Sequence, residues 1–146
     1  GYDTVSVCLS KGLGAPIGSL LAGPKDLLHV ARRMRKALGG GMRQVGILAA
    51  AGLYAMEHHV DRLADDHARA ERLAAGLRAA GYGAARPETN MVYVTVPDGD
   101  TWVAALGERG IRALTVGPQE LRLVTHLDVD DAGIARTLEA FRELAT

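Results

Sequence analysis

A single lysine, Lys11, stands where a short apolar run gives way to a glycine-rich stretch. Val5, Val7 and Leu9 precede it, and the residues that follow interrupt regular structure: Gly12, Gly14, Pro16 and Gly18. We therefore expect Lys11 at the end of a buried strand, where burial disfavours the ammonium form and lowers a lysine pKa. A neutral amine forms Schiff bases with aldehydes and ketones. The alternative is a solvated lysine beside an ordinary loop.

Three consecutive glycines, 39–41, lie between two predicted helices and have cations on both sides. Lys36 precedes them, and Arg43 is expected in the first turn of a helix that begins near Met42 or Arg43. Open backbone N–H groups at a helix start, together with a fixed cation, suit a phosphate or a carboxylate. An ordinary helix connection, in which the glycines supply positive φ, is the alternative.

Arg122 interrupts an alternating strand pattern at 121–125 near the end of the chain. An arginine on a rigid strand can bind a carboxylate with two parallel hydrogen bonds, although most such arginines point outward and are inert. Asn90, just before another predicted strand, is a weaker candidate for lining a cleft. His126 is expected to be a structural neighbour of Arg122.

The residues before position 83 must place Lys11 and the glycine triplet. Ranges 5–9 and 19–22 predict an antiparallel strand pair around the lysine, and a helix is expected from Pro24 to about Leu38. Range 44–58 is apolar all round, which predicts a buried helix. Range 60–82 is amphipathic and predicts a linker helix.

The last part of the chain predicts a small α+β arrangement that would carry Arg122. Strands are expected at 91–96, 111–116 and 120–124, and helices at 101–108 and 130–144, with Asp130 or Asp131 as the N-cap of the last. This order predicts an antiparallel sheet with two helices on one face.

Composition excludes several classes of function. The 146 residues are 48% hydrophobic and carry 17 basic and 17 acidic side chains, which gives no electrostatic basis for binding nucleic acid or a membrane surface. Cys8 is the only cysteine, so a disulfide framework is excluded. His58 and His59 do not face each other on a helix and are expected at the surface or at a boundary, so no metal site is predicted. A cytoplasmic location is expected.

Five blocks of the sequence, in order and at similar intervals, resemble the low-specificity L-threonine aldolases. The blocks are Ser6–Ser19, Leu38–Gln44, Leu48–Ala55, Thr89–Met91 and Leu121–Leu127. These enzymes use pyridoxal 5'-phosphate (PLP) and have the aspartate-aminotransferase-like fold, PLP fold type I. The resemblance covers essentially the whole chain, which makes it far more specific than a lone Ser-Lys-Gly.

The resemblance implies an α/β parent of fold type I, of which this chain is the C-terminal part. Residues 1–58 would end the large PLP-binding domain, 59–82 would form the linker helix, and 83–146 the small α+β domain. In the family the PLP lysine lies well into the chain, and this sequence begins without a methionine. A longer enzyme is therefore expected, with part of its cofactor site outside this chain.

The resemblance also implies roles for individual residues. Lys11 would bind PLP as a Schiff base, Lys36 and Arg43 would lie at the cofactor's phosphate region, and Arg122 would hold the substrate's α-carboxylate. The implied reaction is cleavage of L-threonine or L-allo-threonine to glycine and acetaldehyde, by a homo-oligomer that is a dimer or a tetramer.

Two other interpretations remain open at this stage. Another fold type I PLP lyase would keep Lys11 and Arg122 but not the Gly-Gly-Gly-Met-Arg-Gln block at 39–44. The chain could also be a non-catalytic folded fragment. As a fragment it is expected to be inactive alone, whatever its parent does.

Overall fold

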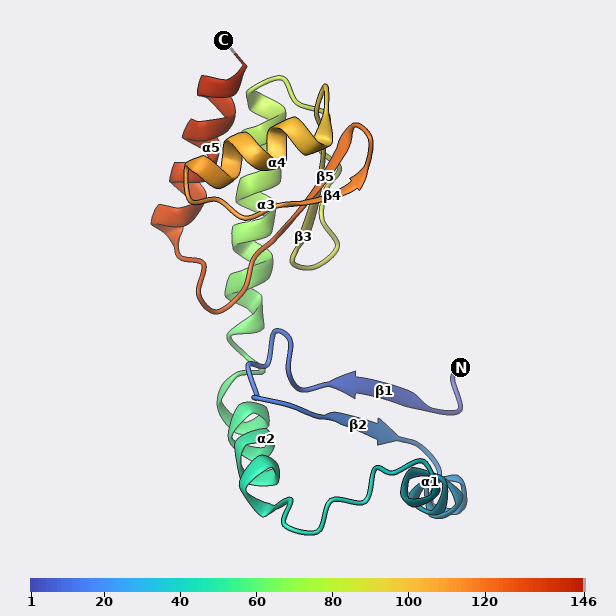
Figure 1. The fold of residues 1–146 in the computed structure, drawn as a ribbon. Helices are drawn as coiled ribbons and strands as arrows, with labels where there is room; N and C mark the ends of the chain where they lie inside the picture. Colours follow the sequence, from blue (N-terminus) through green and yellow to red (C-terminus); the bar gives the residue numbers. More distant parts are fainter. Residues whose placement is uncertain (146) are drawn as a thin grey trace. The chain divides into compact units, whose positions relative to one another are not determined.

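A computed structural model describes residues 1–145 and divides the chain into two units at Arg62 (Figure 1). The first unit is Gly1–Arg62, and the second starts at Leu63. The division assigns the helix that follows Arg62 to the second unit. The linker role expected for 59–82 stays a prediction, as do the domain limits 1–58 and 83–146.

The first unit contains two strands and two helices. β1 (Val5–Cys8) and β2 (Ser19–Ala22) pair antiparallel, with Cys8 opposite Ser19, so the predicted strand pair around the lysine is confirmed. The helices are α1 (Lys25–Ala37) and α2 (Gly46–His58).

The expectation that the strand before Lys11 is buried is wrong for this chain. Val5 is 51% exposed and Val7 40% exposed, because β1 and β2 form a two-stranded sheet with no further strand beside it in the described part of the chain. Leu9, which directly follows β1, is buried. The apolar run predicted the strand correctly, but burial depends on neighbours that this sheet lacks.

The connection between α1 and α2 also differs from the prediction. Pro24 is the N-cap of α1 and not its first helical residue. At the other end Gly39, at φ +87°, ends the helix, and the N–H groups of Gly39 and Gly40 donate to the carbonyls of Lys36 and Arg35. The chain then stays irregular until Gly46, so α2 begins later than expected.

Helix α2 is not buried on all sides, contrary to the prediction. Gly52 and Ala55 are its buried residues, whereas Ile47 and Leu53 are 84% and 63% exposed. An apolar composition indicates a helix that is suited to burial. It does not supply the partner surface.

The second unit is a three-stranded antiparallel sheet with helices. The sheet has the order β3-β5-β4, so β5 is central. The elements in chain order are α3 (Leu63–Ala79), β3 (Met91–Thr95), α4 (Gly99–Glu108), β4 (Leu114–Gly117), β5 (Glu120–Val124) and α5 (Asp131–Leu144). Asp130 caps α5 by accepting a hydrogen bond from the Gly133 N–H at 2.7 Å, which confirms the predicted cap.

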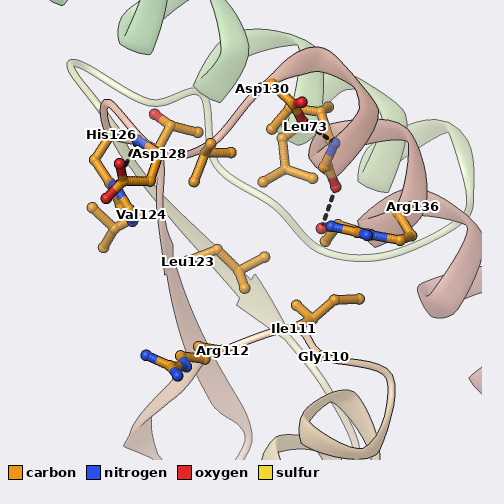
Figure 2. Close-up of a pocket in the computed structure, with 15 residues that line it drawn as sticks. Leu73, Gly110, Ile111, Arg112, Leu123, Val124, His126, Asp128, Asp130 and Arg136 are labelled. Atoms are coloured by element: carbon orange, nitrogen blue, oxygen red, sulfur yellow. Dashed lines mark hydrogen bonds and ion pairs between the residues drawn. The ribbon is translucent and has the colours of Figure 1, made fainter.

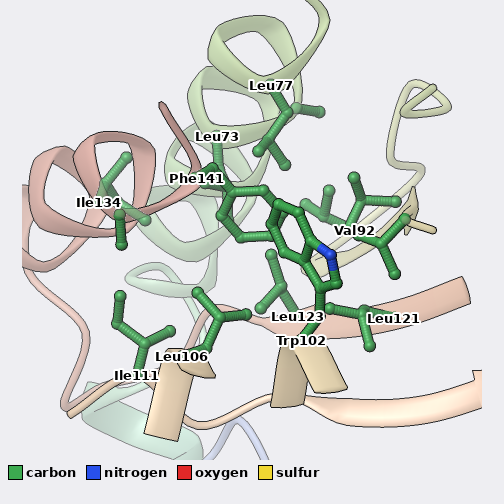
Figure 3. Packing of buried hydrophobic residues seen from close by; sticks show 14 of the residues in the cluster. Leu73, Leu77, Val92, Trp102, Leu106, Ile111, Leu121, Leu123, Ile134 and Phe141 are labelled. Carbon is green, nitrogen blue, oxygen red and sulfur yellow. The ribbon is translucent and has the colours of Figure 1, made fainter. Parts of the chain in front are cut away.

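One face of the sheet is covered by a hydrophobic core that three helices share. Val92, Val94, Leu121 and Leu123 alternate inward from β3 and β5. Figure 3 shows the ring of Phe141 from α5 beside Trp102 from α4, with Leu73 and Leu77 of α3 in the same cluster. The prediction that two helices cover the sheet was therefore incomplete, because the apolar side chains of α3 also pack into this core.

The opposite face of the sheet is open, and Arg122 lies on it. Arg122 falls between the inward-facing Leu121 and Leu123, and its cross-strand neighbours are Tyr93 on β3 and Leu114 on β4. Both neighbours are exposed. None of the helices described is both long and apolar enough to cross a membrane.

Candidate active site

Lys11 sits in a tight turn directly after β1. The N–H of Gly14 donates to the Lys11 carbonyl at 2.8 Å, and the N–H of Ala15 donates to the carbonyl of Leu9 at 2.9 Å. Gly14, at φ +70°, adopts a backbone conformation that favours glycine. These bonds fix where the lysine leaves the backbone.

The side chain of Lys11 is exposed, which corrects the expectation of a buried amine. The described part of the chain supplies no cover for it, so the desolvation on which the sequence argument relied is absent here.

Residues of α2 and of the segment that follows it contact the lysine turn. The sequence did not indicate these contacts. A Cβ placed on Gly52 would lie 3.1 Å from the Leu9 side chain, so the helix backbone approaches Leu9 closely. His59 Nδ1 lies 2.6 Å from the carbonyl oxygen of Leu13, and Arg62 Nη1 donates to that of Gly12 at 3.2 Å. His59 is half-buried, whereas the adjacent His58 is exposed.

Cys8 neighbours this turn and is half-buried. Its Sγ lies 3.4 Å from the Ser10 hydroxyl. Hydrogen bonding to Ser10 lowers the pKa of the Cys8 thiol.

Lys36 and Arg43 lie on either side of the glycine triplet, as predicted, but Arg43 is in the irregular segment before α2 and not in a helical turn. Lys36 belongs to the last turn of α1, and its side chain lies against Gly41. A Cβ there would come within 2.5 Å of Lys36 Cδ and 3.0 Å of its Nζ. Both cations are exposed, and none of the ion pairs found among the described residues uses them.

Arg122 is partly buried on the central strand, and its Nε is a buried atom with no hydrogen-bond partner in the described chain. A buried guanidinium N–H without an acceptor is unfavourable, so such groups normally have one. The Nε–H of Arg122 is therefore a donor available to an anion such as a carboxylate.

Asn90 forms hydrogen bonds at the end of the sheet. It does not line a cleft around Arg122, which was the role expected from the sequence. Its Nδ2 donates to the Thr125 carbonyl at 2.8 Å, and the Thr125 N–H donates to the Asn90 carbonyl at 3.0 Å. The buried Thr125 hydroxyl donates to the backbone carbonyl of Asp66 at 2.7 Å. These bonds tie β3, β5 and α3 together three residues beyond Arg122.

A separate pocket of about 360 Å³ lies where β5 leads into α5 (Figure 2). Leu73, Ile111, Leu123 and Ile134 contribute its apolar lining, and Arg122 is not among its residues. Leu123 points to the core side of the sheet, whereas Val124, which also lines the pocket, lies on the same side as Arg122, so the pocket is at the end of β5 beyond Arg122. His126, expected beside Arg122, lines the pocket instead.

The four predicted site residues are divided between the two units. Within the first unit, no hydrogen bond or ion pair joins Lys11, Lys36 and Arg43 in the described residues. Arg122 belongs to the second unit.

Solved structures place this architecture among the fold type I enzymes of PLP. A threonine aldolase from Leishmania major superposes with a TM-score of 0.81 at 24% identity, over 99% of this chain and 45% of that one. A structure of SPT with a PLP internal aldimine gives a TM-score of 0.76 at 19% identity, over 97% of this chain and 39% of that one. The fold class expected from the sequence is thereby confirmed.

The chain belongs to the beta-eliminating lyase family, whose model matches residues 1–98. It is 48% identical over 142 residues to the low-specificity L-threonine aldolase of Escherichia coli K12, an alignment that covers 96% of this chain and 42% of that protein. The resemblance seen in the five sequence blocks is therefore confirmed. The chain spans about two fifths of the length of the curated relatives it matches.

Proposed function

We propose that this chain is part of a PLP-dependent carbon–carbon lyase that cleaves L-threonine or L-allo-threonine to glycine and acetaldehyde. The observation that carries the proposal is the Lys11 turn, held in place after β1 in a chain 48% identical to a threonine aldolase. A lysine amine on a rigid turn can capture the aldehyde of PLP.

Three residues of the first unit would hold the cofactor. Lys11 would bind its aldehyde carbon, and the exposed cations Lys36 and Arg43 would face its phosphate. Lys36 fits this role because its stem rests against Gly41, where any side chain would displace it. PLP itself would supply the electron sink for the negative charge left on the substrate's α-carbon.

Arg122 would bind the α-carboxylate of the substrate. Its place on the central strand between two paired neighbours limits the positions open to its guanidinium. The unpartnered Nε supports this role, because a carboxylate supplies the acceptor that the described chain lacks. Fixing the carboxylate orients the substrate and so selects which α-carbon bond breaks.

We also propose that the working enzyme is a cytoplasmic homo-oligomer, a dimer or a tetramer, with 59–82 as the helix that links its domains. The exposed apolar residues of α2 support an additional contact surface, since Ile47 and Leu53 are open to solvent here.

Borohydride reduction after PLP addition tests the cofactor assignment. We expect the phosphopyridoxyl label on Lys11 alone in the full-length protein, mapped by digestion and mass spectrometry. Label confined to Lys11 in this chain as well would mean that the lysine site assembles without the rest of the enzyme. Label spread over surface lysines in this chain but confined to Lys11 in the full-length enzyme would support the inactive-fragment alternative. Diffuse label in both would refute the role of Lys11.

A second candidate is a β-eliminating lyase, because the family match over residues 1–98 carries that description. The two reactions give different products from a β-substituted amino acid. Release of glycine and an aldehyde from threonine supports the aldolase, whereas release of ammonia and a 2-oxo acid supports elimination.

A further inference from the structure

We propose that His59 and Arg62 are positioning residues that brace the peptide groups after Lys11 and so hold its amine at the reacting carbon. This inference rests on the proposed function of Lys11. It assigns a role to two side chains that are not among the residues proposed to hold the cofactor or the substrate.

The two side chains bind consecutive carbonyls of the lysine turn. Arg62 Nη1 donates to the Gly12 oxygen at 3.2 Å, and His59 Nδ1 donates to the Leu13 oxygen at 2.6 Å. A carbonyl has no proton to give, so Nδ1 of His59 must carry the hydrogen. Both donors come from the segment that follows α2, about 50 residues along the chain.

The ring of His59 is itself held in position. The ring of Tyr54 meets it edge-to-face, with the ring centroids 5.6 Å apart. His59 is half-buried, whereas His58, whose ring lies 4.2 Å from Tyr54, is exposed and makes no hydrogen bond to the lysine turn in the described structure.

The two side-chain donors add to the backbone hydrogen bonds that already shape the turn, and they act on its glycine-rich part. Gly12 and Gly14 lack side chains that could pack, and glycine backbones have the widest conformational freedom. The side chain of Lys11 is exposed, so its position depends on the backbone of the turn. A displacement of about 1 Å at a reacting group can reduce the rate on the order of a hundredfold.

Three variants of the full-length enzyme test the brace. His59→Phe keeps a ring but removes the donor, His59→Asn restores an N–H close to the position of Nδ1, and His58→Phe is the matched control. We expect kcat for threonine cleavage to fall at least tenfold in His59→Phe with KM within about twofold, and His59→Asn to recover most of the loss. Borohydride label should remain on Lys11 in all three.

Arg62→Gln provides a second test, because His59→Phe could fail to fold. This variant should also lower kcat by a larger factor than it changes KM. Its circular dichroism spectrum should match that of the wild type. Wild-type kcat in either soluble variant, or equal losses in His58→Phe and His59→Phe, would overturn the brace while Lys11 keeps its label. Absence of label on Lys11 in the wild type would overturn the proposed function, and the brace with it.

Discussion

Asn90 and Thr125 lie one residue beyond the Met91–Val124 pair that ends the β3–β5 ladder, and the side-chain amide of Asn90 donates to the Thr125 carbonyl at 2.8 Å. The backbone of Thr125 returns a hydrogen bond to Asn90 at 3.0 Å, and its hydroxyl reaches the carbonyl of Asp66. The bonds fix the strand register that sets Arg122 opposite Tyr93. A one-residue slip would turn Arg122 to the core face.

Thr125→Val should therefore destabilise the second unit. The substitution keeps the side chain's shape but removes a buried donor, at a cost of about 1–3 kcal/mol in unfolding free energy. Urea unfolding followed by fluorescence of Trp102, the only tryptophan, reports on this unit. Thr95→Val, at an exposed position of β3, is the control and should change stability by less than about 0.5 kcal/mol. Equal stabilities of the two variants would contradict the role of Thr125.

Arg122→Lys should lower kcat/KM for the amino acid substrate while keeping the positive charge at this position. Lysine lacks the planar fork that binds a carboxylate with two hydrogen bonds. We expect kcat/KM for threonine to fall about 10- to 100-fold, which corresponds to about 1.5–3 kcal/mol for a hydrogen bond to a charged group. Arg112→Lys, an exposed arginine of the same unit, should leave kcat/KM unchanged. A loss of similar size in both variants would show that the effect is not specific to position 122 and would contradict carboxylate binding by the Arg122 guanidinium.

Gly41→Ala should move the amine of Lys36 without unfolding the protein. The new Cβ would meet the Lys36 side chain at 2.5 Å, and a flexible lysine can swing away at little cost in stability. If that amine faces the phosphate, the dissociation constant for PLP should rise by up to about fivefold, the range of an exposed ion pair. Gly46→Ala, where a Cβ has no atom within 4 Å, is the matched control, and absorbance titration with PLP compares the two.

Asp131→Asn should remove a pH-dependent part of the second unit's stability. Hydrogen bonds from Arg69 and Arg72 lower the pKa of the Asp131 carboxyl in the folded state. The contribution is therefore complete above the unfolded aspartate pKa, about 3.9, and is lost as pH falls through the lower folded value. We expect the variant to be less stable than wild type at pH 7, and the difference to shrink as the pH drops below about 4.

Glu139→Gln on the same helix is the control for this titration, because Glu139 is exposed and belongs to none of the ion pairs found in the described residues. Its stability difference from wild type should stay small across the same pH range. A difference for Asp131→Asn that stays constant down to pH 2 would show that its effect is not electrostatic.

The sequence predicted the elements whose signals are local. The alternation at 91–96 predicts β3, and Asp130 was one of two predicted caps of α5, whose partner Gly133 is only three residues away. The fold class and the resemblance to threonine aldolases were also predicted correctly. Such features are readable because the relevant atoms are neighbours along the chain.

The features that were missed depend on distant contacts. The bond from His59 to Leu13 joins residues 46 apart, and its acceptor is a backbone carbonyl that no residue type marks. The exposure of Lys11 could not be predicted from the apolar residues before it. Apolar residues indicate a segment that can be buried, but they do not identify the part of the protein that would pack over it. The late start of α2 was missed because a glycine triplet ends a helix without fixing the length of the loop that follows.

The core of the second unit is drawn from residues between Ala70 and Phe141, all of them beyond the division at Arg62. A chimaera could join this unit to the preceding portion of a related enzyme. The unit would keep all the buried apolar side chains of its own core in that chimaera. Arg122 and its strand neighbours would travel with that core. The unit is therefore an exchangeable module, and moving it between relatives would test the carboxylate role proposed for Arg122 without redesigning a hydrophobic interior.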